Sequence, residues 1–174
     1  MWESFLQSHN GKSIFLPSNE ASSETLNLYT DSSLKACAAV FGSNWFVIHF
    51  PVSWQAKNIA FLELYPIVVA VHVFSKALSN SRVCFHTDNE AISIVLNKQS
   101  AKDKPIMKLI RPFVLACMKF NIKFRSKHIP GKLNILADRL SRSFQVEPQL
   151  LELHGMSPVP TQVPAALLPS NWQL

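Results

Sequence analysis

Cysteine is scarce in this 174-residue sequence, and no two cysteines form a Cys-x-x-Cys pair. The three present, Cys37, Cys84 and Cys117, are odd in number and widely spaced, which argues against a disulfide framework or a thiolate zinc site. A secretory signal is also lacking, because the start, Met1-Trp2-Glu3, has an early acid and no basic region followed by an apolar stretch. We therefore expect a reducing, intracellular location and not secretion.

Long hydrophobic runs are absent as well. The most apolar segment, residues 59–74, contains Glu63, Pro66 and His72 and is too short to span a bilayer, so we expect no membrane association. With 48% hydrophobic and 10% aromatic residues, the chain can nevertheless bury a core and is not a disordered tail. Its length predicts one compact domain with some additional residues.

Acidic residues are few between positions 98 and 142. Twelve of the 17 Lys and Arg lie there against only two acids, so this region carries a net charge of +10, whereas the rest of the chain carries −4. Such a basic region indicates a polyanionic partner, with nucleic acid as the first candidate. A solvated surface is the alternative explanation, and charge alone does not decide between the two.

Hydrophobic periodicity predicts the order of the elements. Three strands joined by short turns are expected at 26–30, 36–41 and 45–50, and they should pair antiparallel. A helix at about 62–78 follows, in which Pro66 is tolerable only within the first turn. The remaining predictions are strands at 82–87 and 122–126 and helices at 90–97, 105–120 and 133–141, with Pro112 kinking or restarting the second helix. This order predicts an α/β fold with a five-stranded mixed sheet, three antiparallel strands and then two parallel ones, flanked by helices.

Composition divides the chain into three segments. Residues 1–25 are polar and form a lead-in segment, and residues 26–143 form the α/β domain. Residues 144–174 carry five of the 11 prolines without periodicity, which predicts an extended linker or tail.

Four acids stand where strand or helix ends should converge. Asp31 and Asp88 end predicted strands, Glu63 lies near the start of a helix, and Asp138 lies in the last helix. Gathered together, four carboxylates would repel one another unless cations were bound, and oxygen ligands suit Mg²⁺ or Mn²⁺. Two such ions about 4 Å apart could clamp a phosphodiester, with Asp31 as the bridging ligand. For any single acid, a helix cap or strand end is the simpler explanation.

The residues around these acids resemble a family. Thr30-Asp31-Ser32-Ser33, Leu62-Glu63-Leu64, His86-Thr87-Asp88-Asn89 and the run HIPGKLNILADRLSR (128–142) are similar to ribonuclease H domains. The resemblance is strongest to those that follow the reverse transcriptase of retrotransposons, particularly the tyrosine-recombinase (DIRS-like) class. It covers roughly residues 26–142, and the last motif is its most specific part. The lead-in also resembles the segment that joins such polymerases to this domain, notably at Trp2, Phe5-Leu6 and Asn10-Gly11.

The resemblance implies a ribonuclease H-like fold and cleavage of the RNA strand of RNA–DNA hybrids during retroelement reverse transcription. Two Mg²⁺ (or Mn²⁺) ions are implied as cofactors, held by Asp31, Glu63, Asp88 and Asp138. His128, on a Pro-Gly turn ten residues before Asp138, is implied as a further catalytic residue that protonates or releases the product, since a histidine near neutral pKa suits proton transfer. A reverse transcriptase polymerase domain on the same polyprotein is implied as a partner.

Substrate contacts follow from the same resemblance. Small polar residues beside the acids are expected to meet RNA 2′-hydroxyls, and cations are expected to hold phosphates. The residues concerned are Ser32, Ser33, Asn89, Lys132, Asn134, Arg139 and Arg142. Each could equally be a cap or a surface charge.

The sequence departs from the family in three respects. Ala36-Cys37-Ala38-Ala39 stands where relatives have glycines and an aromatic residue, so the second strand is expected to pack differently. The segment between Asp88 and Asp138 is too short for an extra basic helix, and no Tyr-x-Asp-Asp polymerase motif occurs. Two alternatives to an active nuclease therefore remain open: a non-catalytic nucleic-acid-binding module, and a structural fragment of a polyprotein that works only beside its polymerase.

Overall fold

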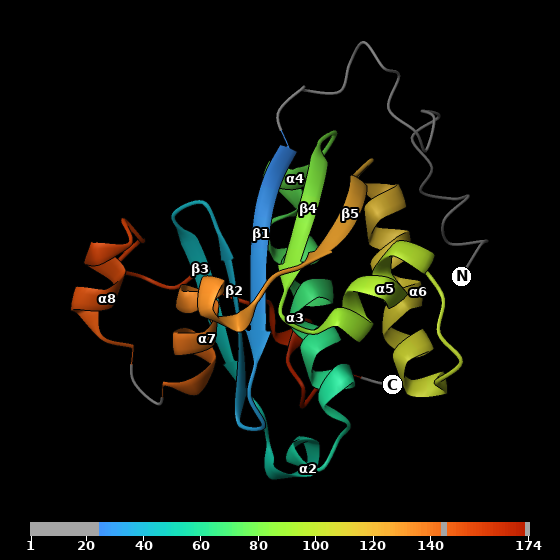
Figure 1. Cartoon of the computed structure of the whole chain (residues 1–174), viewed down its shortest axis with the longest axis horizontal. Helices are drawn as coiled ribbons and strands as arrows, with labels where there is room; N and C mark the ends of the chain where they lie inside the picture. The colour runs from blue at the N-terminus through green and yellow to red at the C-terminus, as the bar shows by residue number, and fades with distance from the viewer. Residues whose placement is uncertain (1–24, 144–145, 173–174) are drawn as a thin grey trace.

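A mixed five-stranded sheet forms the centre of the computed structural model, which describes residues 25–143 and 146–172 (Figure 1). The predicted lead-in, with Trp2, Phe5-Leu6 and Asn10-Gly11, lies outside the described residues apart from its last position. The strands are β1 (Thr25–Ser32), β2 (Ala36–Phe41), β3 (Asn44–His49), β4 (Arg82–Thr87) and β5 (Lys123–His128). Their order is β3-β2-β1-β4-β5, with β1, β2 and β3 antiparallel and β1, β4 and β5 parallel. The predicted fold class is confirmed.

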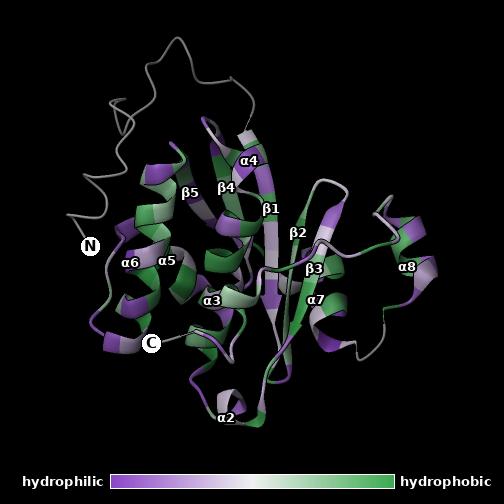
Figure 2. Ribbon diagram, turned by 180° about the vertical axis from the view of Figure 1, so that it is seen from behind, coloured by the Kyte–Doolittle hydropathy of each residue, from purple (hydrophilic) through white to green (hydrophobic). Residues whose placement is uncertain are grey.

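Helices cover the sheet unequally. The helices are α2 (Val52–Gln55), α3 (Ile59–Val73), α4 (Ser75–Leu78), α5 (Glu90–Lys98), α6 (Lys104–Lys119), α7 (Ile135–Arg142) and α8 (Pro148–Leu153), with 3-10 turns η1 (Gly131–Leu133) and η2 (Ala165–Leu167). The main core lies between the sheet and α3, α5 and α6 (Figure 2). A smaller core lies on the other face, where α7 packs on β1 and β2. No helix among the described residues has the length and apolarity needed to cross a membrane.

Small side chains on β2 bring α7 close to the sheet. Ala38 of β2 is fully buried in the smaller core together with Ala137 and Leu140 of α7. Ala38 is also the β2 partner of Asp31 in the antiparallel register. The alanine therefore brings α7 over the strand that carries the first acid. Cys37, Cys84 and Cys117 are buried and free.

Both internal prolines lie well inside helices, contrary to the expectation for Pro66. The helix α3 begins at Ile59, with the Asn58 side chain accepting a hydrogen bond from Ala60 N, so Pro66 is not in the first turn. Proline removes the N–H that would bond to the carbonyl four residues earlier. That carbonyl belongs to Leu62, and the Ser32 hydroxyl donates to it at 2.8 Å. Similarly, α6 continues across Pro112 instead of restarting there.

The C-terminal residues pack on the domain, although the sequence predicted an extended linker. Leu151 of α8 and Met156 join the smaller core. The chain then passes the outer edge of β3, where Ser157 N donates to Ser43 O and Thr161 N donates to Trp45 O. On the far side Trp172 packs against Tyr65 of α3. Apolar residues spaced along the tail, rather than a helical period, make these contacts, so hydrophobic periodicity does not reveal them. The three-segment division remains a prediction.

Replacement of Leu151 by Ala is expected to lower the free energy of unfolding by about 2 kcal/mol, because it leaves a cavity between α8 and the sheet. The matched control is Leu153→Ala on the same helix, where the leucine is 79% exposed and the expected change is below about 0.5 kcal/mol. Urea denaturation measures both. Equal effects of the two substitutions would mean that the tail does not pack on the domain in solution.

Candidate active site

Three carboxylates meet at one end of the sheet. Asp31 lies near the end of β1, and Asp88 directly follows β4. The parallel register pairs Tyr29 with His86, so its continuation by two residues places Asp88 beside Asp31. Glu63 comes from α3, which packs against β1. Oxygen atoms of the three side chains all lie within 4.8 Å of one another, close enough to share a metal ion.

Residues of β1 hold Glu63 in place. The backbone N–H of Ser32 donates to its carboxylate, and the Ser32 hydroxyl bonds the carbonyl of Leu62 that Pro66 leaves free. Ser32 therefore holds α3 at two adjacent residues, which fixes the position of Glu63 relative to Asp31. The second oxygen of Glu63, Oε2, is buried and has no hydrogen-bond partner in the described part of the chain. A buried carboxylate oxygen without a partner, lying among other acids, is a ligand that a divalent cation would satisfy.

Burial and mutual repulsion disfavour charge on these acids. Burial raises the pKa of Asp31 to about 6, and the neighbouring Asp88 and Asp138 act in the same direction while the Ser141 hydroxyl opposes it. Burial raises the pKa of Glu63 to about 9, and Asp31 and Asp88 add to the increase. Because a bound cation would relieve both effects, the residues fit the implied metal centre.

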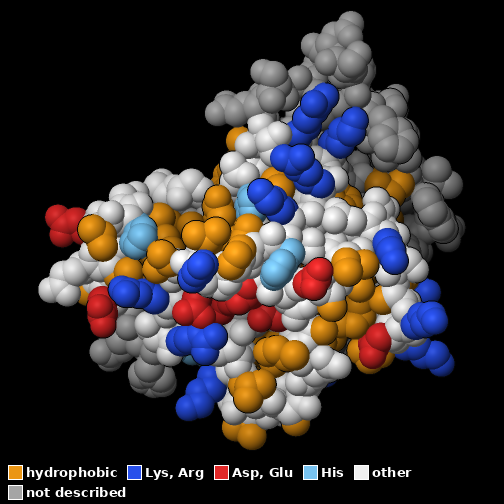
Figure 3. Space-filling model, viewed as in Figure 1, with side chains coloured by type: hydrophobic (Ala, Val, Ile, Leu, Met, Phe, Trp, Pro, Cys, Tyr) orange, Lys and Arg blue, Asp and Glu red, His pale blue; other side chains and the backbone are white. Residues whose placement is uncertain are grey.

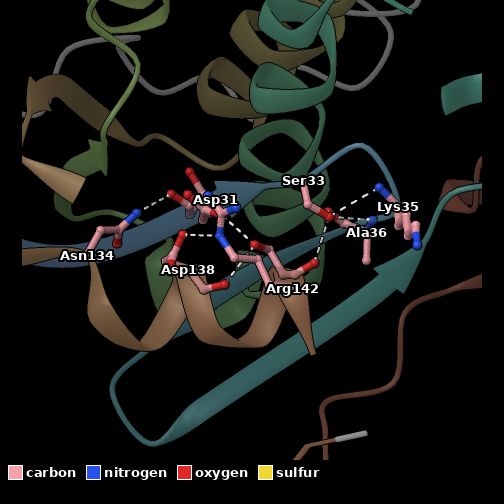
Figure 4. A network of polar contacts seen from close by, with 9 residues as sticks. Asp31, Ser33, Lys35, Ala36, Asn134, Asp138 and Arg142 are labelled. Carbon is pink, nitrogen blue, oxygen red and sulfur yellow. Dashed lines mark hydrogen bonds and ion pairs between the residues drawn. The ribbon is translucent and has the colours of Figure 1, made fainter. Parts of the chain in front are cut away.

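The fourth predicted acid stands outside this cluster. Asp138, in the first turn of α7, forms an ion pair with Arg142 one turn later, with Nε and Oδ1 2.5 Å apart (Figure 4). Both side chains are partly exposed, at 33% for Asp138 and 65% for Arg142. Asp138 is nevertheless near enough to raise the pKa of Asp31. The structure thus brings together three of the four predicted ligands and pairs the fourth with a cation.

Replacement of Arg142 by Gln is expected to tighten Mn²⁺ binding about two- to fivefold, because it frees Asp138 and removes a positive charge beside the carboxylates. Isothermal titration with Mn²⁺ alone measures this effect. The control is Arg139→Gln, which removes an exposed cation of the same helix that has no ion pair among the described residues. Equal Mn²⁺ affinity of the two variants would contradict a competition between Arg142 and the metal for Asp138.

Ser141, to which the sequence patterns assign no role, contacts Asp31. Its hydroxyl donates to Oδ2 of Asp31 and also lies 2.9 Å from the carbonyl of Asp138. The residue is 1% exposed. The signal in the sequence is its spacing, because a residue three positions after Asp138 shares its helix face. Ser141 therefore couples the position of α7 to Asp31.

The turn after β5 approaches Asp88. His128, the last residue of β5, is exposed, and its Nε2 lies 3.1 Å from the backbone carbonyl of Asp88. A Cβ atom on Gly131 would stand 3.2 Å from Oδ2 of Asp88, which is tighter than an ordinary contact. Glycine thus allows the turn to come within reach of this carboxylate. The predicted catalytic role of His128 remains a proposal, and the residue lies beside the acids.

The predicted substrate residues fall into two groups. Ser32, Ser33 and Asn134 make internal hydrogen bonds: the Ser33 hydroxyl donates to Ser141 O, and Asn134 Nδ2 donates to Thr30 O at 2.9 Å. Asn134 is only 2% exposed, so it connects the start of α7 to β1 rather than offering its amide to solvent. The second group remains accessible. Asn89 caps α5 and is half-buried, whereas Lys132, Arg139 and Arg142 are exposed.

Positive charges surround the acids on one face of the molecule. Figure 3 shows a patch of acidic side chains with Lys and Arg on several sides and a histidine beside it. The sequence contains 17 such cations and 11 acids. A polyanion that approached this face would meet cations around a site able to hold metal ions.

Comparisons with known proteins agree with this architecture. No protein-family model and no curated protein matches the sequence. Among solved structures, the chain is similar to the crystal structure of RNase H1 from the halophilic archaeon Halobacterium salinarum, with a TM-score of 0.54 and 13% identity over 67% of this chain and 94% of that one. It also matches the N-terminal RNase H domain of a Mycobacterium tuberculosis protein, solved as a fusion with maltose-binding protein, with a TM-score of 0.45, 12% identity and coverage of 67% and 95%. The first of these, with the sheet topology, identifies a ribonuclease H-like fold.

Proposed function

We propose that this chain is an endonuclease that hydrolyses the RNA strand of RNA–DNA hybrids with two divalent metal ions. The observation that carries the proposal is the cluster of buried Asp31 and Glu63 with half-buried Asp88 on a ribonuclease H-like fold. Divalent cations held by these carboxylates would supply Lewis-acid chemistry, which activates water as the nucleophile and stabilises charge on the leaving oxygen.

The chain's own residues would have separate tasks. Asp31, Glu63 and Asp88 hold the cations, and Asp138 joins them when Arg142 is displaced. His128 is exposed beside Asp88 and is available to transfer a proton to the departing 3′ oxygen. Lys132, Arg139 and Arg142 hold phosphates without reading sequence, and Asn89 is the accessible polar residue next to Asp88 that can meet a 2′-hydroxyl.

The biological setting belongs to the proposal as well. The motifs from Thr30 to Arg142 resemble ribonuclease H domains that follow retrotransposon reverse transcriptases of the DIRS-like class. On that basis the hybrid arises during reverse transcription, and a polymerase domain on the same polyprotein delivers it.

The direct test is cleavage of a labelled RNA–DNA hybrid by the full chain with Mn²⁺, Mg²⁺ or EDTA. Double-stranded DNA and double-stranded RNA of the same sequence serve as comparison substrates. We expect the RNA strand of the hybrid alone to be cut, and only with a divalent ion. A parallel preparation of Asp31→Asn controls for contaminating nuclease. Cleavage in EDTA, or equal cleavage of double-stranded DNA, would refute the proposal.

One observation favours a second candidate, a non-catalytic or polymerase-dependent nucleic-acid-binding fragment. Because Asp138 is paired with Arg142, the cluster found among the described residues holds three acids instead of the four expected. This candidate predicts hybrid binding without turnover at any Mn²⁺ concentration. Cleavage that appears only after a polymerase domain is added would distinguish the polymerase-dependent form from the purely binding one.

A further inference from the structure

The strands β4 and β5 present a row of basic residues on the face of the sheet that α7 leaves uncovered. Along β5, Phe124 and Ser126 turn toward the helices, whereas Lys123, Arg125 and Lys127 alternate with them and are exposed. The register aligns Arg82 with Lys123, Cys84 with Arg125 and His86 with Lys127. We call the set Arg82, Lys123, Arg125 and Lys127 the basic sheet face.

The charges of the basic sheet face are unbalanced. Among the described residues, no carboxylate forms an ion pair with any of its four members. The Nε atom of Arg82 is buried and has no hydrogen-bond partner within residues 25–143 and 146–172. An anion bound here would satisfy a buried donor and neutralise the unpaired positive charges.

The residues of the basic sheet face lie along a line that ends near the carboxylate cluster. Alternate residues of a strand are separated by about 6.6 Å, which is comparable to the spacing of successive phosphates along a nucleic-acid strand. β4 and β5 both run toward the acids, because Asp88 follows the last residue of β4 and His128 ends β5. Figure 3 shows Lys and Arg side chains over this part of the sheet, leading toward the acidic patch.

The far end of the row contains a cavity. It measures about 250 Å³ and is lined by Arg82, Lys123 and Arg125, together with Thr25, Val83 and Phe124. Three cations and no acid line it, so it suits a phosphate group. At the near end, Tyr29 stacks on His86 with ring centroids 4.6 Å apart. Cations that follow a backbone, with an aromatic pair beside them, are typical of surfaces that bind single-stranded nucleic acid.

We propose that the basic sheet face binds the backbone of a single nucleic-acid strand that continues beyond the hybrid held at the acids. The proposal deepens the proposed function, since it assigns the path of the substrate outside the catalytic site. An acidic protein would not require cations at regular strand spacing leading into a metal-binding cluster. The chain would therefore bind hybrids with a single-stranded extension more tightly than blunt hybrids.

The test measures binding without cleavage. Fluorescence anisotropy in EDTA compares the full chain on a blunt RNA–DNA hybrid and on hybrids with a 5′ or a 3′ single-stranded extension of about ten nucleotides, a length within the range that such surfaces cover. We expect at least one extension to tighten binding about tenfold at low salt. In the triple variant Lys123→Gln, Arg125→Gln, Lys127→Gln this gain should disappear. The slope of log affinity against log salt for the extended hybrid should become shallower by about 2, since about 0.7 counterions are released per phosphate contact on a single strand.

The matched control removes the same residue types from the opposite side of the molecule. Lys104, Lys108 and Arg111 are exposed on α6, so the triple Gln variant there has the same net charge as the first. Equal losses in both variants, or no gain from either extension in the wild type, would overturn the inference. Circular dichroism verifies that both variants are folded. Because the assay needs no metal and no turnover, failure of hybrid cleavage would leave the result on the basic sheet face unaffected.

Discussion

Replacement of Asp88 by Asn is expected to reduce hybrid cleavage by at least about 10³-fold, equivalent to about 4 kcal/mol of transition-state stabilisation. The substitution keeps the shape of the side chain but removes one of the three carboxyl groups of the cluster. Asp88 is only half-buried, so Asn at this position should be tolerated by the fold. Single-turnover cleavage of a labelled hybrid with saturating Mn²⁺ measures the loss.

The matched control is Asp103→Asn. Asp103 accepts a hydrogen bond from Ile106 N at the start of α6, and asparagine caps a helix equally well. Its activity should stay within about twofold of wild type. An Asp88→Asn protein that still cleaves at a tenth of the wild-type rate would show that the cluster is not the catalytic centre, whatever the fold.

The metal-free protein is expected to lose stability as the pH rises from about 4 to 9. The pKa values of Asp31 and Glu63 are raised from 3.8 to about 6 and from 4.5 to about 9, so the folded state binds these protons more tightly than the unfolded state. Stability from this source is complete below the unfolded pKa values and is lost as the pH passes through the folded ones. The total loss should be several kcal/mol, because each pKa unit corresponds to about 1.4 kcal/mol.

Thermal unfolding in EDTA, at about pH 5 and pH 9, tests this dependence with Glu63→Gln. The variant cannot ionise at this position, so it should unfold at a higher temperature than wild type at the alkaline pH and should be inactive. The control, Glu90→Gln, alters an exposed acid of α5 and should follow wild type. Mn²⁺ should stabilise wild type most at high pH, where protons no longer compete for the ligands. A stability that rises with pH in EDTA would contradict the repulsion inferred among the acids.

The sheet was predictable because β1 alternates apolar and polar residues, β2 and β4 are short and largely apolar runs, and the turns between the first three strands are short. The β2 and β4 boundaries agree with the prediction, and β1, β3 and β5 differ by only a few residues. The convergence of Asp31, Glu63 and Asp88 could also be predicted, since parallel strands place their ends at one edge of the sheet. These features depend on the local residue pattern and on the order of strands and helices along the chain, and both can be read from the sequence.

Other features depend on contacts between distant residues. A proline signals a helix boundary locally, but Pro66 is tolerated in α3 because Ser32 supplies the missing donor. The pairing of Asp138 with Arg142 and the contact of Ser141 with Asp31 depend on how α7 is rotated on the sheet. The tail has no period of its own, so its packing on β3 and α3 follows from shape and not from pattern.

The passage of the tail along β3 also determines when the domain can be completed during synthesis. The indole N–H of Trp45 donates to the carbonyl of Ser157, a partner made 112 residues later. At a translation rate of about 5–20 residues per second, the outer edge of β3 stays unpaired for on the order of 6–22 seconds. An unpaired strand edge is a template for association with other chains. Nascent copies on neighbouring ribosomes would therefore be most prone to aggregation in this interval, and slower translation between codons 50 and 157 would lengthen it.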